Sequence, residues 1–287
     1  MYLTILGNPT YCYTGGKAFD TAKPTIVFIH GVLNDHSVWI LQTRYLANHG
    51  FNVLAVDLPG HAKSAGANRD MAPCLSVEAA ADFVIALLDA AGVTTAALVG
   101  HSFGSLIALE AAARVPDRIT HLALLGTAFP MPVSPALLET SLNQPLKAID
   151  MVNTFSHSML APPPSALGPG TWLYGSSKAL MRRVQASNSA FNLFFTGFTA
   201  CNEYKNGLAN VLSAKSAMLF IVGKSDQMAL SKATKTLIDA AKTCQKNVKV
   251  VTLEAGHQMM TEAPDGVLMA LKDFLAPLLS PPNSLSA

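Results

Sequence analysis

Residues 96–114 read AALVGHSFGSLIALEAAAR, and this stretch decides the fold. The apolar run at 96–99 predicts a buried strand, and the run at 105–114 predicts a helix. Between them, Gly100-His101-Ser102-Phe103-Gly104 leaves room only for a very tight turn. Such a turn strains the serine backbone and raises its hydroxyl above the sheet, while glycine on both sides leaves space for the neighbouring strand and helix. We therefore predict that Ser102 is a nucleophile at a helix start.

Serine is a poor nucleophile alone, because its hydroxyl must lose a proton to a base that an acid orients. His257 and Asp226 each come four residues after an expected strand, at 248–253 and 218–222 respectively. Both loops should lie at the carboxyl edge of the same sheet as Ser102, so we predict the triad Ser102, Asp226 and His257. Glu254 is the alternative acid, but it lies in the loop of His257 and would face that imidazole poorly.

The segment His30-Gly31-Val32 directly follows another expected strand, at 25–29. Glycine allows the backbone to bend there, so a backbone N–H can point at an oxyanion that forms on the substrate. The predicted oxyanion donors are the amides of Val32 and Phe103. We expect structural roles for the segment Asp57-Leu58-Pro59-Gly60-His61 and for the histidines His30, His36, His61 and His101.

Further outward, the chain alternates short apolar runs with helical stretches, which is typical of a parallel α/β sheet. The expected strands are 25–29, 52–56, 96–99, 122–125, 218–222 and 248–253, preceded by short strands near 2–6 and 10–13. The strands from 25 onward are continuous apolar runs, so we expect helices on both faces of a central sheet. The expected helices lie near 37–49, 76–91, 104–115, 230–243 and 264–278.

The alternation stops between about Pro130 and Asn210, which predicts a helical insertion at 130–210 within a core domain of 1–129 and 211–287. No charged residue lies between 151 and 177, so much of the insertion should face apolar surroundings. Four phenylalanines share one helical face, which either packs the insertion onto the core or lines an apolar pocket, or both: Phe191, Phe194, Phe195 and Phe198. The expected pocket residues are Leu33, Met159, Trp172, Phe194, Phe198 and Met228.

The composition of the chain excludes several classes of function. Half of the 287 residues are hydrophobic, and the 13% that are charged give a formal net charge of only +2. Without a cluster of positive charge, nucleic acid is not an expected partner. Prolines interrupt the long uncharged stretches and no secretory signal is visible, so we expect no transmembrane segment. Four scattered cysteines suggest free thiols in the cytoplasm, and no metal-binding spacing is present.

These segments together resemble the α/β-hydrolase fold superfamily, and within it the lid-bearing, cofactor-independent serine hydrolases. The resemblance covers nearly the whole chain, from the His30-Gly31 loop to Gly256-His257. It implies a mostly parallel central sheet flanked by helices with a helical lid, and it implies the same roles for the five site residues predicted above. The chain departs from the family pattern at Ala62 and Ser105, where relatives usually carry glycine, and neither position bears on the chemistry.

The resemblance leaves the reaction open. A serine at the elbow argues against the epoxide hydrolase and haloalkane dehalogenase branches, which place aspartate there. Ester hydrolysis on a small apolar substrate, without cofactor, is the foremost prediction. C–C bond hydrolysis, cofactor-free peracid formation or halogenation, and a small-ligand receptor with incidental hydrolysis are the alternatives. The natural substrate and the oligomeric state are not predicted.

Overall fold

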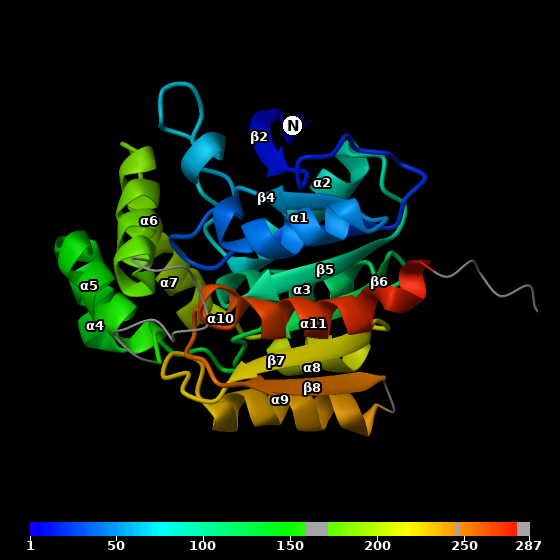
Figure 1. The fold of residues 1–287 in the computed structure, drawn as a ribbon. Helices are drawn as coiled ribbons and strands as arrows, with labels where there is room; N and C mark the ends of the chain where they lie inside the picture. Colours follow the sequence, from blue (N-terminus) through cyan, green and yellow to red (C-terminus); the bar gives the residue numbers. More distant parts are fainter. Residues whose placement is uncertain (159–171, 245–246, 280–287) are drawn as a thin grey trace, which may run out of the picture.

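A computed structural model describes residues 1–158, 172–244 and 247–279 (Figure 1). The described residues form one eight-stranded sheet in the order β1-β2-β4-β3-β5-β6-β7-β8. Strands β3 to β8 pair in parallel, whereas β1 and β2 join the sheet edge antiparallel. The strands are β1 Tyr2–Ile5, β2 Asn8–Tyr13, β3 Thr25–Ile29, β4 Asn52–Val56, β5 Ala96–His101, β6 Ile119–Leu125, β7 Ala217–Gly223 and β8 Val248–Leu253.

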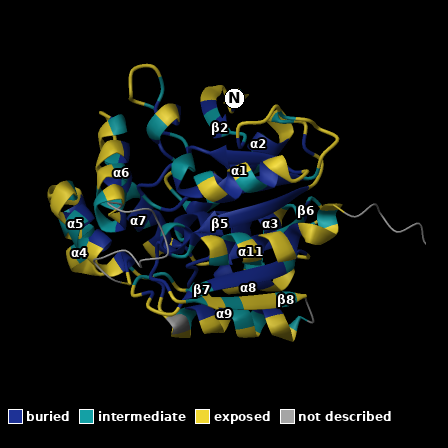
Figure 2. Cartoon of the chain, viewed as in Figure 1, coloured by how far each residue is buried: buried dark blue, intermediate teal, exposed yellow. Residues whose placement is uncertain are grey.

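The central strands are as buried as their apolar sequences predict. Every residue of β3, β4 and β5 is buried, because helices cover both faces of the sheet (Figure 2). The expectation of two covered faces is wrong for β8, in which no residue is fully buried and Val250 is 41% exposed. This strand lies at the sheet edge and carries Lys249 and Thr252, side chains that suit contact with water.

Helices form a layer on each face of the sheet (Figure 1). Helices α2 (Val77–Ala90), α3 (Phe103–Arg114), α8 (Gly207–Ser213) and α9 (Ser231–Thr243) contribute to one hydrophobic cluster with the sheet, and α1 (Ile40–Asn48), α10 (Met259–Glu262) and α11 (Pro264–Leu275) contribute to the other. Short 3-10 helices lie at His36–Trp39, Ala62–Ser64 and Ala276–Leu279. The expected core helices are therefore all present, although the stretch at 37–49 divides into a 3-10 turn and α1.

Four further helices lie between β6 and β7 in the sequence: α4 Pro135–Asn143, α5 Pro145–Ser156, α6 Leu173–Ser187 and α7 Leu193–Glu203. They gather at one end of the sheet (Figure 1), around a third hydrophobic cluster that includes Ile149, Val184, Phe194 and Leu33. Helix α8 packs instead against α3 and α9, although residues 207–210 fall inside the expected insertion. No helix among the described residues is long and apolar enough to cross a bilayer.

Candidate active site

The turn from β5 to α3 has the strained geometry that its sequence predicts. Ser102 has φ +53°, a left-handed conformation that is rare for residues with a side chain, and its N–H donates to Leu125 O at 2.9 Å. A Cβ atom on Gly100 would lie 2.2 Å from Gly104 O, and one on Gly104 would lie 2.3 Å from Ile29 O. Both glycines are therefore required, because any side chain would overlap backbone.

The loop after β3 packs directly against this turn. A Cβ atom on Gly31 would lie 3.2 Å from Ser102 Cβ, so the two backbone segments are close. The N–H groups of Val32 and Phe103 donate to no other described residue. Phe103 is the first residue of α3, where amides point along the helix axis without an intrahelical partner. The two predicted donors therefore have no partner among the described residues.

Asp226 and His257 meet across the loops that follow β7 and β8. Asp226 Oδ2 accepts a hydrogen bond from His257 Nδ1 at 2.8 Å, while Oδ1 accepts from the N–H groups of Met228 and Ala229, both at 2.8 Å. A Cβ atom on Gly223 would lie 2.3 Å from Gly256 O, so a glycine there allows the two loops to touch. Glu254, the alternative acid, is exposed and pairs with Lys224 at 2.7 Å rather than with His257.

The backbone of His257 is fixed on both sides. Its N–H donates to Ser156 O at 2.8 Å, and its carbonyl accepts from His101 Nε2 at 2.9 Å. The end of α5 is held to the same loop by Glu262, whose carboxylate accepts from the N–H of Gly256 and from the N–H and hydroxyl of Ser158. We call this set of contacts among Ser156, Ser158, Gly256 and Glu262 the histidine-loop latch.

Electrostatics favour an ionised acid beside a histidine base. Burial raises the pKa of Asp226, but the His257 imidazole and the two backbone N–H groups lower it more, so the pKa lies below the ordinary value. Burial and the nearby His257 lower the pKa of His101 to about 3, which keeps that imidazole neutral and free to donate from Nε2. Cys201 of α7 lines the same space as Ser102 and His257, but burial raises the pKa of its thiol to about 12, which disfavours a competing thiolate.

Ser102 and His257 both line a cavity of about 250 Å³ between the sheet edge and helices α4, α5 and α7. Its walls are largely apolar: Met131, Pro132, Val133, Leu137, Met151, Val152, Phe155, Phe198, Cys201, Met228 and Ala229, with Ser134 and Gln227. Most of these residues were not predicted. Those on the β6–α4 loop follow no helical or strand period, so only the tertiary structure shows that they face the site.

The predicted pocket residues divide into three groups. Phe198 and Met228 line the cavity, and Phe194 lines a narrow extension of it while packing against Phe198 with ring centroids 4.7 Å apart. Of the predicted phenylalanine stripe, Phe194 and Phe198 therefore face these spaces, whereas Phe191 is exposed. Leu33 lines neither space, because it is fully buried among α5, α6 and α7. Trp172 also lines neither, since it is 56% exposed and stacks on Tyr174. Met159 lies outside the described residues.

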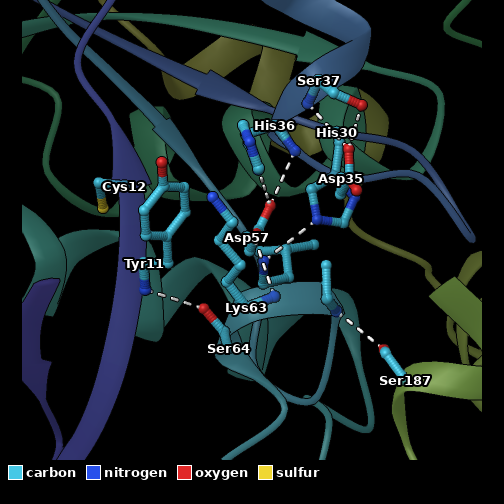
Figure 3. Close-up of polar contacts among 12 residues, drawn as sticks. Tyr11, Cys12, His30, Asp35, His36, Ser37, Asp57, Lys63, Ser64 and Ser187 are labelled. Atoms are coloured by element: carbon cyan, nitrogen blue, oxygen red, sulfur yellow. Dashed lines mark hydrogen bonds and ion pairs between the residues drawn. The ribbon is translucent and has the colours of Figure 1, made fainter. Parts of the chain in front are cut away.

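The loop around Asp57 is a structural support, as its sequence suggests (Figure 3). Asp57 Oδ1 accepts from the N–H of His36 at 2.8 Å and lies 2.8 Å from His36 Nδ1, while Oδ2 accepts from the N–H of Lys63. His30 bridges its own loop to the loop after β4, with Nδ1 bonded to Gly31 O and Nε2 accepting from Leu58 N–H. A cation could fit between the ligand atoms of Asp35, His36 and Asp57, which lie close together. These atoms already have protein partners, however: His36 and Asp57 bind each other, and Asp35 binds Ser37 and Arg183.

Comparison with known proteins gives both sequence and structural matches. A family model described as "alpha/beta hydrolase fold" matches residues 24–156. The pimeloyl-[acyl-carrier protein] methyl ester esterase of Neisseria meningitidis is 38% identical over 112 residues, which are 39% of this chain and 40% of the esterase. The epoxide hydrolase of Caballeronia sordidicola is 33% identical over 109 residues, 38% of this chain and 32% of that enzyme.

The structural likeness extends much further than the sequence matches. The enol-lactonase from Burkholderia xenovorans LB400 superposes with a TM-score of 0.77 over 96% of this chain and 100% of that chain, at 22% sequence identity. The chain spans well under half of the length of the two curated relatives. The family model therefore matches only residues 24–156, whereas the structural match covers nearly all of the chain.

Proposed function

The chain has the α/β-hydrolase fold, and from that premise we propose that it is a serine hydrolase that cleaves a carboxylic ester with an apolar acyl or alkyl group. The observation that carries the proposal is one constellation: Ser102 on a strained turn shares a cavity with His257, whose Nδ1 is 2.8 Å from Asp226 Oδ2. Nucleophile, base and orienting acid are the three parts that acyl transfer by serine requires.

In the proposed reaction, Ser102 Oγ attacks the ester carbonyl while His257 Nε2 takes the hydroxyl proton. Asp226 holds the imidazole with its Nδ1–H directed at Oδ2 and stabilises the imidazolium that forms. The N–H groups of Val32 and Phe103 donate to the tetrahedral oxyanion. His257 then gives its proton to the leaving alcohol, and a water molecule, activated by the same histidine, releases the acid from the acyl-enzyme.

The apolar cavity supports an apolar group on the substrate. Its walls come largely from α4, α5, α7 and the loop before α4, so we assign the insertion that carries α4 to α7 as a lid. Residues 207–210, which we expected in the insertion, belong to α8 and join the core. Burying an alkyl chain there stabilises the bound substrate by about 0.8 kcal/mol for each methylene group. Chain length should therefore affect kcat/KM until the cavity is filled.

The test is hydrolysis of a p-nitrophenyl ester series, acetate to dodecanoate, by wild type, Ser102→Ala and Ser213→Ala. The exposed Ser213 provides a matched control for the same substitution. We expect turnover in wild type and Ser213→Ala and none above background in Ser102→Ala. A folded wild type that hydrolyses none of these esters would contradict the proposal and favour C–C bond hydrolysis or ligand binding.

A further inference from the structure

Two amide side chains of largely buried residues beside the candidate active site have no hydrogen-bond partner among the described residues. Asn34 and Gln258 are 2% and 6% exposed, and neither side chain forms a hydrogen bond to another described residue. Neither residue contributes a fully enclosed polar atom without a partner, so the amide atoms of both face accessible space rather than packed protein. Asn34 follows the segment His30-Gly31-Val32 and Gln258 directly follows His257, so both amides lie next to predicted site residues.

Both amides lie at a narrow passage that leads away from the apolar cavity. This neck, of about 20 Å³, is lined by Ser102 and His257 as well as by Asn34 and Gln258. Beyond it lies a second cavity of about 230 Å³, in whose wall Asn34 and Gln258 appear again. The apolar cavity shares Ser102, Phe198 and His257 with the neck. The neck therefore shares wall residues with both cavities, and Ser102 lines the neck and the apolar cavity.

The wall of the second cavity has more polar side chains than that of the first, although apolar atoms form most of the exposed lining of both. Besides the two amides, its wall contains Ser37, Ser176, Ser177, Arg183 and Thr261, with Val38, Leu173 and Leu180 as its apolar residues. We call it the polar chamber. The neck adds the buried Oγ of Ser156 and Nδ1 of His101, which also have no hydrogen-bond partner among the described residues.

Among the described residues of the polar chamber, no charged side chain lacks an oppositely charged partner. Arg183 is its cation, and Nη2 of that side chain binds Asp35 Oδ2 at 3.1 Å. The carboxylate of Asp35 is 4% exposed, so its charge is not available to a ligand. Carboxamides offer both N–H donors and an oxygen acceptor, and hydroxyls do the same. A complementary ligand group is therefore uncharged and has both a donor and an acceptor.

We propose that Asn34 and Gln258 bind an amide or hydroxyl group of the substrate at the neck of the polar chamber. This inference rests on the proposed function, and the substrate that it describes is an ester with two unlike halves. One half is apolar and occupies the cavity beside Phe198, and the other carries an uncharged hydrogen-bonding group close to the scissile carbonyl. Asn34 and Gln258 then determine specificity and take no part in bond cleavage.

The test uses two pairs of esters with equal heavy-atom counts. In the first pair the amide group is on the alcohol half of the ester, and in the second pair it is on the acyl half. Glycolamide hexanoate is compared with isobutyl hexanoate, and pentyl malonamate with pentyl isovalerate. For each pair, kcat/KM of the amide ester is divided by kcat/KM of the branched alkyl ester. The ratio is measured for wild type, Asn34→Leu, Gln258→Met and the control Gln144→Leu, which makes a similar change at an exposed position.

In at least one pair, we expect Asn34→Leu and Gln258→Met to lower the ratio about tenfold, the size of one hydrogen-bond contribution. Gln144→Leu should leave the ratio at the wild-type value. A merely structural role would lower both members of a pair equally, so a ratio within twofold of wild type in both variants and both pairs would overturn the inference. Wild type inactive on all four esters would instead overturn the proposed function, and this inference with it.

Discussion

Asp226 is the residue whose charge the proposed chemistry depends on most directly. Its lowered pKa keeps the carboxylate ionised at neutral pH, where it can orient His257 and stabilise the imidazolium. We expect Asp226→Asn to lower kcat by on the order of 10⁴-fold at pH 7, because an amide favours the wrong imidazole tautomer. Steady-state kinetics beside Asp239→Asn, an exposed carboxylate paired with Lys235, tests this effect. A loss below tenfold would argue against a catalytic Asp226.

At the residue scale, sequence predicts backbone-determined positions better than pocket walls. The elbow at Ser102 and the meeting of Asp226 with His257 follow from the order of strands, because parallel strands bring their carboxyl ends to one edge. Leu33 and Met228 are similar apolar residues on loops, yet one is fully buried and the other lines the cavity. That difference depends on where α5 and α7 pack, which no local pattern contains.

At the element scale, the histidine-loop latch ties α5 to the loop that carries the predicted base. Glu262 uses both carboxylate oxygens as acceptors, one for Gly256 N–H and one for Ser158. Glutamine has a single acceptor oxygen, so Glu262→Gln places an NH₂ group against a backbone N–H. We expect kcat to fall between about 10-fold and 100-fold, since displaced catalytic groups react poorly.

The control for Glu262 lies eight residues earlier in the sequence. Glu254→Gln makes the same change at an exposed carboxylate whose partner is Lys224. Surface ion pairs contribute little, so kcat should change by less than about twofold. Measuring kcat and KM for both variants on one ester separates the two positions. Equal activity of the two variants would show that the latch does not position His257.

The turn between β5 and α3 gives a second prediction at this scale. Alanine normally stabilises a helix by about 1 kcal/mol relative to glycine, but a Cβ on Gly104 would lie 2.3 Å from the backbone oxygen of Ile29. The overlap should dominate, so we expect Gly104→Ala to lower the free energy of unfolding by about 3 kcal/mol.

Gly266 in α11 is the matched position, because a Cβ there meets only the flexible end of the Leu253 side chain. Gly266→Ala should change the free energy of unfolding by less than about 1 kcal/mol. Urea denaturation followed by circular dichroism compares the two variants with wild type. A Gly104→Ala variant as stable as Gly266→Ala would mean that β3 and α3 are not closely packed in solution.

At the same scale, apolar runs predict well where strands lie, but they predict less well whether helices cover both faces of a strand. Residues 25–29 and 248–253 are both strands at the predicted positions, but only the first is covered on both faces. The difference arises from the order of strands, in which β8 has a neighbour on one side only. Helix α8 is a second example. Its first residues fall within the insertion that we predicted from the sequence, but the helix packs against α3 of the core.

At the scale of the whole molecule, three buried histidines link stability to pH. Burial is the main cause that lowers the pKa of His30, of His61 to about 4 and of His101 to about 3. In the unfolded chain each would have its ordinary pKa of about 6.5. Between these values the unfolded state binds more protons than the folded state, so stability is retained above pH 6.5 and is lost as pH falls toward the folded-state pKa values.

For His61 alone, the linkage amounts to about 2 kcal/mol between pH 7 and pH 5. We expect the free energy of unfolding of wild type to fall over this interval, and that of His61→Asn to fall by about 2 kcal/mol less, because asparagine cannot titrate. The asparagine amide can replace the contact of His61 Nδ1 with Pro59 O. The exposed His49, changed to asparagine, is the control that should leave the pH dependence unaltered. Urea unfolding at both pH values measures the difference, and an equal loss in His61→Asn and wild type would mean that His61 is not buried in its neutral form.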